Sequence, residues 1–360
     1  MSSDLDNFQK TLAAFKAGDI VIVTDDDDRE NEGDLIVAGS LCTPEKMAFI
    51  IRHTSGIICA PVTADEAKRL HLNPMVAAND APLGTAFTIS VDVRHGLTTG
   101  ISAEERTNTI RALANNNIGA GDFVRPGHVF PLIARQGGVL MRSGHTEAAV
   151  DLCQLCELPA VAAIGELMND DGSVMHGADI KKFAVQHKLP VITVADLISY
   201  RQAREKLVER VGELNVETPI GMAKGVIYKT PFDSVEQLAL VFGDIGGGKN
   251  IPARLHRQNI LDDIFGNQER LQATYARFQV AGGGVLVYLR EGAAGVPSTH
   301  LAGTSTSDTS RSQNWHEVGL GAQILRDLGV SSIRLISSRP MRYVGLEGFG
   351  ITIAETEMVK

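Results

Sequence analysis

The chain has 360 residues, is 44% hydrophobic and carries a formal net charge of −9 at pH 7. This length exceeds what one hydrophobic core normally supports, so we expect two domains. The acidic balance argues against nucleic acid as the main partner, because phosphate backbones recruit faces rich in lysine and arginine.

The first residues, Met1–Gly18, place Phe8, Leu12 and Phe15 at helical spacing and predict an amphipathic helix. They lack the apolar segment of a signal peptide, and no stretch approaches the roughly eighteen apolar residues that span a membrane. All four cysteines lie at or before Cys156. Without a secretion signal, this pattern predicts reduced thiols in the cytoplasm and no membrane partner.

An acidic stretch, Asp25–Asp34, follows a short buried strand predicted at Asp19–Thr24. It holds seven acidic side chains and one basic side chain, Arg29. Such runs are usually solvated loops, but ligand sites of α/β proteins favour the carboxyl ends of strands. An EF-hand is excluded because Asn31 stands where that loop needs glycine. The stretch therefore predicts an open carboxylate site for Mg²⁺ or Mn²⁺ that retains waters.

Apolar and polar patterning predicts alternating strands and helices up to about residue 210. We expect strands at Leu35–Gly39, Gly56–Ala60, Thr85–Val91, Gly138–Met141, Ala160–Leu167 and Pro190–Val194, and helices at Thr43–His53, Ala64–Leu70, 103–115, Glu147–Glu157, Asp179–His187 and Ala195–Arg210. The segment Phe123–His128 contains Pro and Gly and is expected to be a loop that carries a histidine.

Two of the predicted helix starts carry side chains suited to binding phosphate. A capping box opens the helix predicted at 103–115, whose early turns present Thr107. A surface cap without a ligand explains this pattern equally well. The second helix is preceded by Arg142 and opened by His145 and Thr146. Glu166, late in an apolar strand, is a carboxylate whose pKa burial could raise.

The positions of the cysteines favour a role in the hydrophobic core over zinc binding or catalysis. Cys153 and Cys156 form a C-x-x-C within one helix, but no second such pair exists for a four-ligand zinc site, so we expect them in the core. Cys59, at a strand end, is either a buried small hydrophobe, which is the commoner case, or a group that faces a pocket.

The composition changes from about residue 206. We expect strands at Val226–Tyr228, Gln237–Phe242, Ile251–His256, Val285–Arg290, Ile333–Ser337 and Ile351–Thr356, and helices at Asp262–Ala281 and Val318–Leu328. Gly243–Lys249 matches most of a P-loop, but Asn250 replaces the Ser/Thr that holds Mg²⁺, and a strand-like run follows where a helix is required. We interpret the match as a hairpin turn.

The blocks DRENEGD, RHTSGIICAP, GTAFTISVDVRHGLTTGISAEERTNTI, RPGHVFPL and RSGHTEAAVDLC occur in this order. On them, residues 1–205 closely resemble the 3,4-dihydroxy-2-butanone 4-phosphate synthases of riboflavin biosynthesis. The resemblance implies a three-layer αβα domain with a mixed sheet. It also implies conversion of D-ribulose 5-phosphate to 3,4-dihydroxy-2-butanone 4-phosphate and formate with Mg²⁺ or Mn²⁺, by a homodimer.

The same resemblance implies the site residues. It places the metal on Glu30 and His145, the substrate on these two and on Arg29, Asp34, Thr107, Arg142, Ser143, Gly144, Thr146 and Glu166, and catalysis on His128, Glu166 and Asp34. The residue patterns alone indicate the acidic loop, the helix start at GHT and the buried glutamate, but they do not indicate which reaction these groups perform.

Residues 206–360 resemble GTP cyclohydrolase II less strongly, on VEQLALVFGDI, ARLH, VLVYLRE and GLGAQILRDLGVSSIRLISS. That family holds a catalytic zinc with three cysteines after the ARLH-like strand, where this chain reads RQNILDDIFGNQER. We therefore expect a smaller αβ domain without zinc and without cyclohydrolase activity. A bifunctional enzyme is the alternative, and a metal- or nucleotide-binding regulator without enzymatic activity is a third hypothesis.

Overall fold

The computed structural model describes residues 2–25, 30–231, 233–290, 319–338 and 350–359. Arg29 and the polar stretch Gly292–Ser312 lie outside the described residues. The chain divides into two compact units, Met1–Ile198 and Ser199–Lys360. Each contains helices and one mixed seven-stranded sheet, which confirms the predicted fold class. Among the described residues, no helix is long and apolar enough to cross a membrane.

The first unit is built on a sheet with the strand order β4-β5-β3-β6-β2-β1-β7. Its strands are β1 (Val21–Thr24), β2 (Gly33–Ala38), β3 (Ile58–Val62), β4 (Val91–Val93), β5 (Phe123–Ile133), β6 (Ala162–Glu166) and β7 (Val191–Thr193). Its helices are α1 (Ser2–Lys16), α2 (Pro44–His53), α3 (Ala64–Arg69), α4 (Ala103–Leu113), α5 (His145–Leu155) and α6 (Gly177–His187); the boundary between the units falls within α7 (Val194–Arg204).

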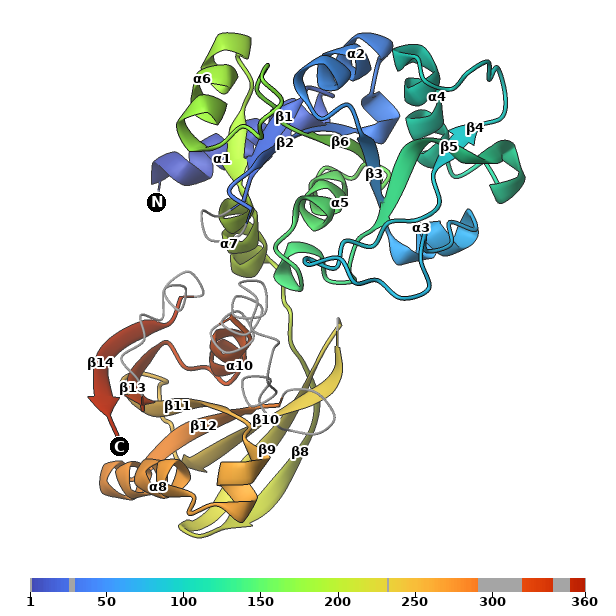
Figure 1. The fold of residues 1–360 in the computed structure, drawn as a ribbon. Helices are drawn as coiled ribbons and strands as arrows, with labels where there is room; N and C mark the ends of the chain where they lie inside the picture. Colours follow the sequence, from blue (N-terminus) through green and yellow to red (C-terminus); the bar gives the residue numbers. More distant parts are fainter. Residues whose placement is uncertain (1, 26–29, 232, 291–318, 339–349, 360) are drawn as a thin grey trace. The chain divides into compact units, whose positions relative to one another are not determined.

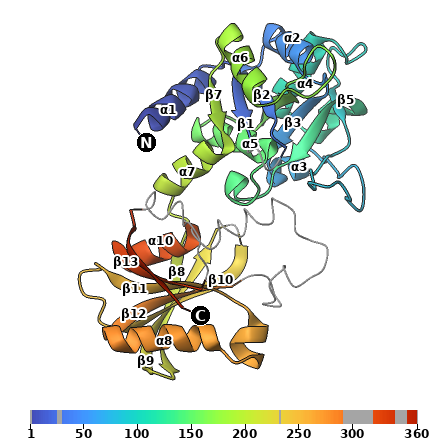
Figure 2. The same ribbon diagram turned by 60° about the vertical axis from the view of Figure 1, so that its left-hand side comes forward.

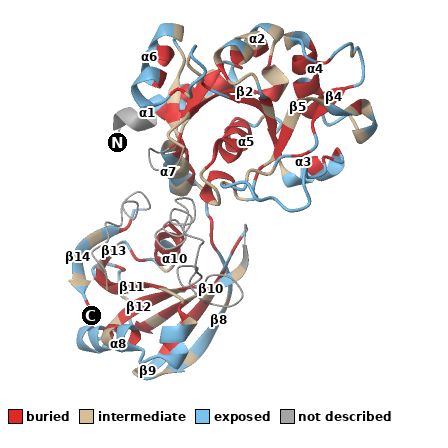
Figure 3. Ribbon diagram, in the orientation of Figure 1, coloured by how far each residue is buried: buried red, intermediate tan, exposed pale blue. Residues whose placement is uncertain are grey.

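Helices cover both faces of this sheet. Strand β2 is buried at every position, and unbroken burial of this kind requires cover on both sides of a strand. Figure 1 shows the sheet between α5 and the pair α2 and α4, and Figure 3 shows β2 and α5 as largely buried. The core joins Ile22 and Leu35 of the sheet to Ile50 of α2 and Ile110 of α4.

The second unit has the strand order β14-β13-β11-β12-β10-β9-β8. Its elements are β8 (Glu209–Thr218), β9 (Gly221–Thr230), β10 (Asp233–Gly243), β11 (Ile251–Arg257), α8 (Glu269–Ala281), β12 (Gly283–Leu289), α10 (Gly321–Asp327), β13 (Ser332–Ser337) and β14 (Thr352–Met358). Side chains of β12 alternate between two clusters, since Val285 packs with Ile324 of α10 while Leu286 packs with Phe278 of α8. The strands accordingly pass between α10 and α8 (Figure 2).

Three predicted elements of the first unit differ from the structure. Phe123–His128 is the first half of β5 rather than a loop, because its backbone pairs with β4. Gly138–Met141 is not a strand: Gly137 and Gly138 have φ of 94° and 62°, and a short 3₁₀ turn occupies Gly138–Leu140. The strand predicted at Thr85–Val91 begins only at its last residue, with isolated bridges before it.

The second unit also differs in detail. The helix predicted at Asp262–Ala281 is broken, because a π-helical turn, Leu261–Phe265, ends at Gly266 before α8 begins. The helix predicted at Ala195–Arg210 ends at Arg204, and its last predicted residues belong to β8, which begins at Glu209 and pairs with β9. Gly243–Lys249 joins β10 to β11, which are separated by β12, so it is not a hairpin turn. A strand follows it, which confirms that it is not a P-loop.

Candidate active site

A cavity of about 130 Å³ lies in the first unit near the start of β2, the end of β6 and the start of α5. Its polar lining consists of Glu30, Glu32, Asp34, Thr85, Arg142, His145, Thr146 and Glu166, and its other lining of Ile57, Cys59, Phe87, Leu132, Ile164 and Gly165. Six of the expected site residues thus share one cavity. Cys59 also lines the cavity. Burial raises the pKa of its thiol, so the side chain is uncharged at neutral pH.

Asp25 holds the end of the acidic stretch, from Glu30 to Glu32, in place. One of its carboxylate oxygens accepts the N–H of Glu30 at 3.1 Å, and the other accepts the N–H of Glu32 at 2.8 Å. Asn31, between them, has a φ of 55°, and its carbonyl oxygen lies 2.6 Å from Nδ1 of His176. The backbone therefore turns back into β2 and presents carboxylates to the cavity. The sequence did not indicate this role of the first aspartate.

The loop and α5 together form a cluster that can hold a metal ion. Asp25, Glu30 and His145 offer ligand atoms that lie within 4.8 Å of one another. Nδ1 of His145 lies 3.8 Å from Glu30 and 4.0 Å from Asp34. Oδ1 of Asp34 and Nε2 of His145 are buried without a hydrogen-bond partner among the described residues. Carboxylate and imidazole ligands suit Mg²⁺ or Mn²⁺, and an ion with its waters accounts for such orphaned atoms.

Two carboxyl groups face each other across neighbouring strands. Asp34 of β2 is the direct partner of Glu166 at the end of β6, and like charges in such positions repel. Burial raises the pKa of Asp34 to about 7; His145 opposes this shift, while Glu166 and Glu30 add to it. A carboxyl group with this pKa can both take up and release a proton near neutral pH.

Arg142 is held in place at the cavity wall. Its Nη1 donates to Glu147 at 2.7 Å, and its Nη2 donates to Thr85 Oγ1 at 3.1 Å. Gly144 caps α5 and leaves room for this pair, because a Cβ there would clash with Arg142 Nη1 and with Glu147. Ser143 lies between them in the chain but does not line the cavity.

Comparison with known proteins identifies the first unit. Residues 9–200 match the family model of 3,4-dihydroxy-2-butanone 4-phosphate synthase. The chain belongs to this family. Residues 209–358 match the model of GTP cyclohydrolase II. The riboflavin biosynthesis protein RibBA of Salinispora arenicola is 44% identical over 365 residues, which cover 96% of this chain and 87% of the relative.

Solved structures agree with both matches. RibBX from A. baumannii, described as a two-domain synthase of the same reaction, aligns with a TM-score of 0.84 and 34% identity over 98% of this chain and 99% of that chain. A 3,4-dihydroxy-2-butanone 4-phosphate synthase in complex with two magnesium ions aligns with 43% identity and a TM-score of 0.54, covering 55% of this chain and 97% of its own. The first unit is therefore the synthase domain, and the second is a cyclohydrolase-type domain.

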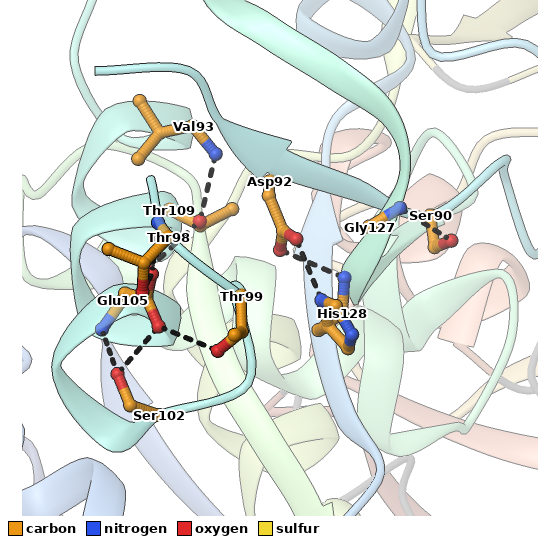
Figure 4. A network of polar contacts seen from close by, with 10 residues as sticks. All are labelled: Ser90, Asp92, Val93, Thr98, Thr99, Ser102, Glu105, Thr109, Gly127 and His128. Carbon is orange, nitrogen blue, oxygen red and sulfur yellow. Dashed lines mark hydrogen bonds and ion pairs between the residues drawn. The ribbon is translucent and has the colours of Figure 1, made fainter. Parts of the chain in front are cut away.

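Four of the described residues expected at the site lie outside the lining of the cavity: Thr107, His128, Ser143 and Gly144. Thr107 is fully buried, and its hydroxyl donates to the carbonyl of Ala103 at 2.7 Å. His128 lies on β5 with 40% of its side chain exposed, and its Nδ1 lies 2.7 Å from Asp92 (Figure 4). The substrate contact expected of Arg29 falls outside the described residues.

The cyclohydrolase-type domain carries a polar cluster at the end of β11. Nε2 of His256 donates to one oxygen of Asp263 at 2.9 Å, and Tyr288 donates to the other at 2.6 Å. The N–H of Asn259 also reaches Asp263 at 2.9 Å, and Arg254 donates to Nδ1 of His256 at 3.3 Å. Burial raises the pKa of Asp263, but these hydrogen bonds lower it by more, so the pKa lies below its usual value.

Proposed function

We propose that the synthase domain binds D-ribulose 5-phosphate in the cavity and releases 3,4-dihydroxy-2-butanone 4-phosphate and formate. One observation carries the assignment of the site: the metal-ligand cluster of Glu30 and His145 and the anchored Arg142 line the same cavity. The cluster suits the hydroxyl and carbonyl oxygens of a sugar, and the arginine suits its phosphate.

The charge balance of the cavity makes a divalent cation necessary for this substrate. Glu30, Glu32, Asp34 and Glu166 line it, while the charge of Arg142 is offset by Glu147. A sugar phosphate anion is repelled by this surface until cations are bound. Glu30 and His145 would hold Mg²⁺ or Mn²⁺, which supplies Lewis acidity toward the substrate oxygens.

The residues of the chain then move protons and fix the substrate. Loss of a carbon as formate requires proton removal at carbon 3 beside the carbonyl, a skeletal shift and hydration. Asp34 and Glu166 are the cavity groups that can take and return these protons. Arg142 and Thr146, with the backbone N–H groups that open α5, would bind the phosphate.

We propose a homodimer formed through an exposed apolar patch beside the cavity. The exposed large apolar side chains there are Ile57, Met75, Val76, Phe87 and Ile89, and a backbone hydrogen bond joins Met75 to Phe87. Ile57 and Phe87 also line the cavity, so a second copy seated here would exclude water from the reaction. His128 lies outside the cavity of its own chain, and its proposed catalytic role therefore requires that it approach from the second copy.

The cyclohydrolase-type domain, we propose, does not open GTP. Attack on the guanine ring needs zinc-activated water, and a catalytic zinc takes three protein ligands. No cysteine follows Cys156 in the sequence, and both ring nitrogens of His256 are already engaged in hydrogen bonds. The match of residues 209–358 to the GTP cyclohydrolase II model favours the alternative of a bifunctional enzyme, and zinc content separates the two.

The direct test is formate release from D-ribulose 5-phosphate by the purified chain, measured with Mg²⁺, with Mn²⁺ and after chelation. We expect release with either ion and none after chelation. We also expect tight binding of the sugar phosphate by calorimetry only when the ion is present. Release that persists in excess chelator would refute the proposed site.

A further inference from the structure

The synthase domain contains a buried carboxylate that contacts His128 twice. One oxygen of Asp92 accepts the backbone N–H of His128 at 2.8 Å, and the other lies 2.7 Å from its Nδ1. Asp92 is only 2% exposed. Because a carboxylate oxygen can only accept, Nδ1 must carry a hydrogen, so the tautomer of the neutral ring is the one whose acceptor nitrogen is Nε2.

The surrounding backbone is built closely around this pair. Gly100 has a φ of 84°, and a Cβ there would clash with the carboxylate of Asp92 and lie 2.7 Å from Nδ1 of His128. Gly127, just before the histidine, has no room for a Cβ against the backbone of Val91 and Asp92. Figure 4 shows the loop that leads to α4 and the strand β5 meeting at these side chains. Such close approach holds the ring orientation as well as its tautomer.

We propose that Asp92 is a positioning residue for catalysis: it holds His128 with Nδ1 protonated, so that Nε2 acts as the proton acceptor. The inference rests on the proposed catalytic role of His128. The side chain of His128 is 40% exposed, so a substrate in a second copy's cavity could reach its Nε2. Burial lowers the pKa of the Arg106 guanidinium, and the attraction of Asp92 opposes this shift. Arg106 thus adds positive charge near the carboxylate of Asp92.

The variant Asp92→Asn tests this arrangement, because an amide can keep the contact with the backbone N–H while its NH₂ donates to Nδ1. The ring is then forced into the tautomer with a protonated Nε2. We expect kcat to fall about 100-fold, within the range for a displaced general acid or base, with KM changed by less than about twofold. A matched control is Asp122→Asn, since Asp122 contacts the exposed His95 at 2.9 Å, and its kcat should match the native value.

Two further measurements keep the test decisive if Asp92→Asn folds poorly. Nitrogen-15 NMR of the native protein, at a pH at which the His128 ring is neutral, should show its hydrogen on Nδ1, and a neutral ring with its hydrogen on Nε2 would overturn the proposal. In a His128→Gln background, Asp92→Asn should cause no further loss of kcat, because Asp92 acts through the ring. If His128→Gln alone keeps native kcat, the catalytic role of His128 and the proposal about Asp92 both fail, while metal-dependent formate release would still support the proposed function.

Discussion

The two domains each place a buried aspartate in a polar cluster on a mixed sheet, yet the two carboxyl groups are in opposite states. In the synthase domain, Asp34 has a pKa raised to about 7 and an oxygen without a hydrogen-bond partner among the described residues. In the cyclohydrolase-type domain, Asp263 accepts hydrogen bonds from His256 and Tyr288, and its pKa is lowered. Burial acts on both in the same direction, so the partners make the difference.

This contrast separates a cluster that needs a ligand from one that completes the fold. A buried carboxylate without donors is costly unless it is protonated or lies near a cation. The burial of Asp34 therefore does not stabilise the fold, and its position is explained by a role in the reaction. Asp263 is explained by stability, because its contacts connect β11, the turn after it and β12.

The largest effect should come from removing a metal ligand of the synthase cluster. Glu30→Gln should lower formate release from D-ribulose 5-phosphate by more than about 100-fold, beyond the loss typical of groups that only support a ligand. The control is Asp262→Asn, which removes the same charge from an exposed side chain next to Asp263. Its rate of formate release should stay within about twofold of the native rate. Near-native activity of Glu30→Gln with a native melting profile would exclude it as a ligand.

The stability of the two domains should respond in opposite directions to the same substitution. In metal-free protein above pH 7, Asp34→Asn should stabilise the synthase domain by about 1–3 kcal/mol, because an ionised buried carboxyl is replaced by a neutral group. Asp263→Asn should destabilise the other domain by about 1–3 kcal/mol, because it leaves donors unpaired. Hydrogen exchange at the amides of β2 and β11 measures each domain separately, and equal signs would contradict the contrast.

A smaller effect should follow from crowding the arginine that we assign to phosphate. Gly144→Ala should raise KM about 10-fold, which corresponds to ~1.4 kcal/mol, because the new Cβ displaces Arg142 from Glu147. Gly121→Ala is the control, since a Cβ there meets open space. A native KM for both variants would argue against Arg142 as the phosphate ligand.

The smallest effect concerns Glu105 of the synthase domain, a carboxylate that, like Asp263, accepts hydrogen bonds. Hydrogen bonds from the backbone and hydroxyl of Thr98 lower the pKa of Glu105 from its usual 4.5 to about 2. Its contribution to stability is present above pH 4.5 and is lost as the pH falls through about 2. Glu105→Gln should therefore lower the melting temperature at pH 7 and approach the native value near pH 2.

Asp34 should show the opposite pH dependence. Its pKa is raised, so in metal-free protein the native domain should lose stability as the pH rises from about 4 to about 7. Asp34→Asn should remove that loss. Melting curves of both variants across this range check the two signs, and a metal-free native protein whose stability does not change over this interval would contradict the assignment.

Much of the candidate site could be predicted because its residues follow strand ends and open a helix. The acidic loop, His145 and Glu166 carry local signals of this kind. Asp25 and Glu147 act through contacts with backbone N–H groups and a guanidinium that only the folded loop and helix bring together. Periodicity and spacing contain no such information, so these two roles could not be predicted.

The errors in the fold have the same origin. Pro and Gly in Phe123–His128 indicated a loop, but pairing with β4 made the segment a strand. The exposed and charged β8 has no buried face to create a pattern, and it is defined by its pairing with β9. Local propensity was therefore overridden wherever a distant strand supplied the hydrogen bonds.

The most direct test of the central claim is a paired assay on one preparation of the full chain, with its zinc content measured. Formate release is followed from D-ribulose 5-phosphate with Mg²⁺ and, separately, from GTP with added Zn²⁺. Our account predicts metal-dependent release from the sugar phosphate, no release from GTP and no stoichiometric zinc. Zinc-dependent release of formate from GTP would contradict it.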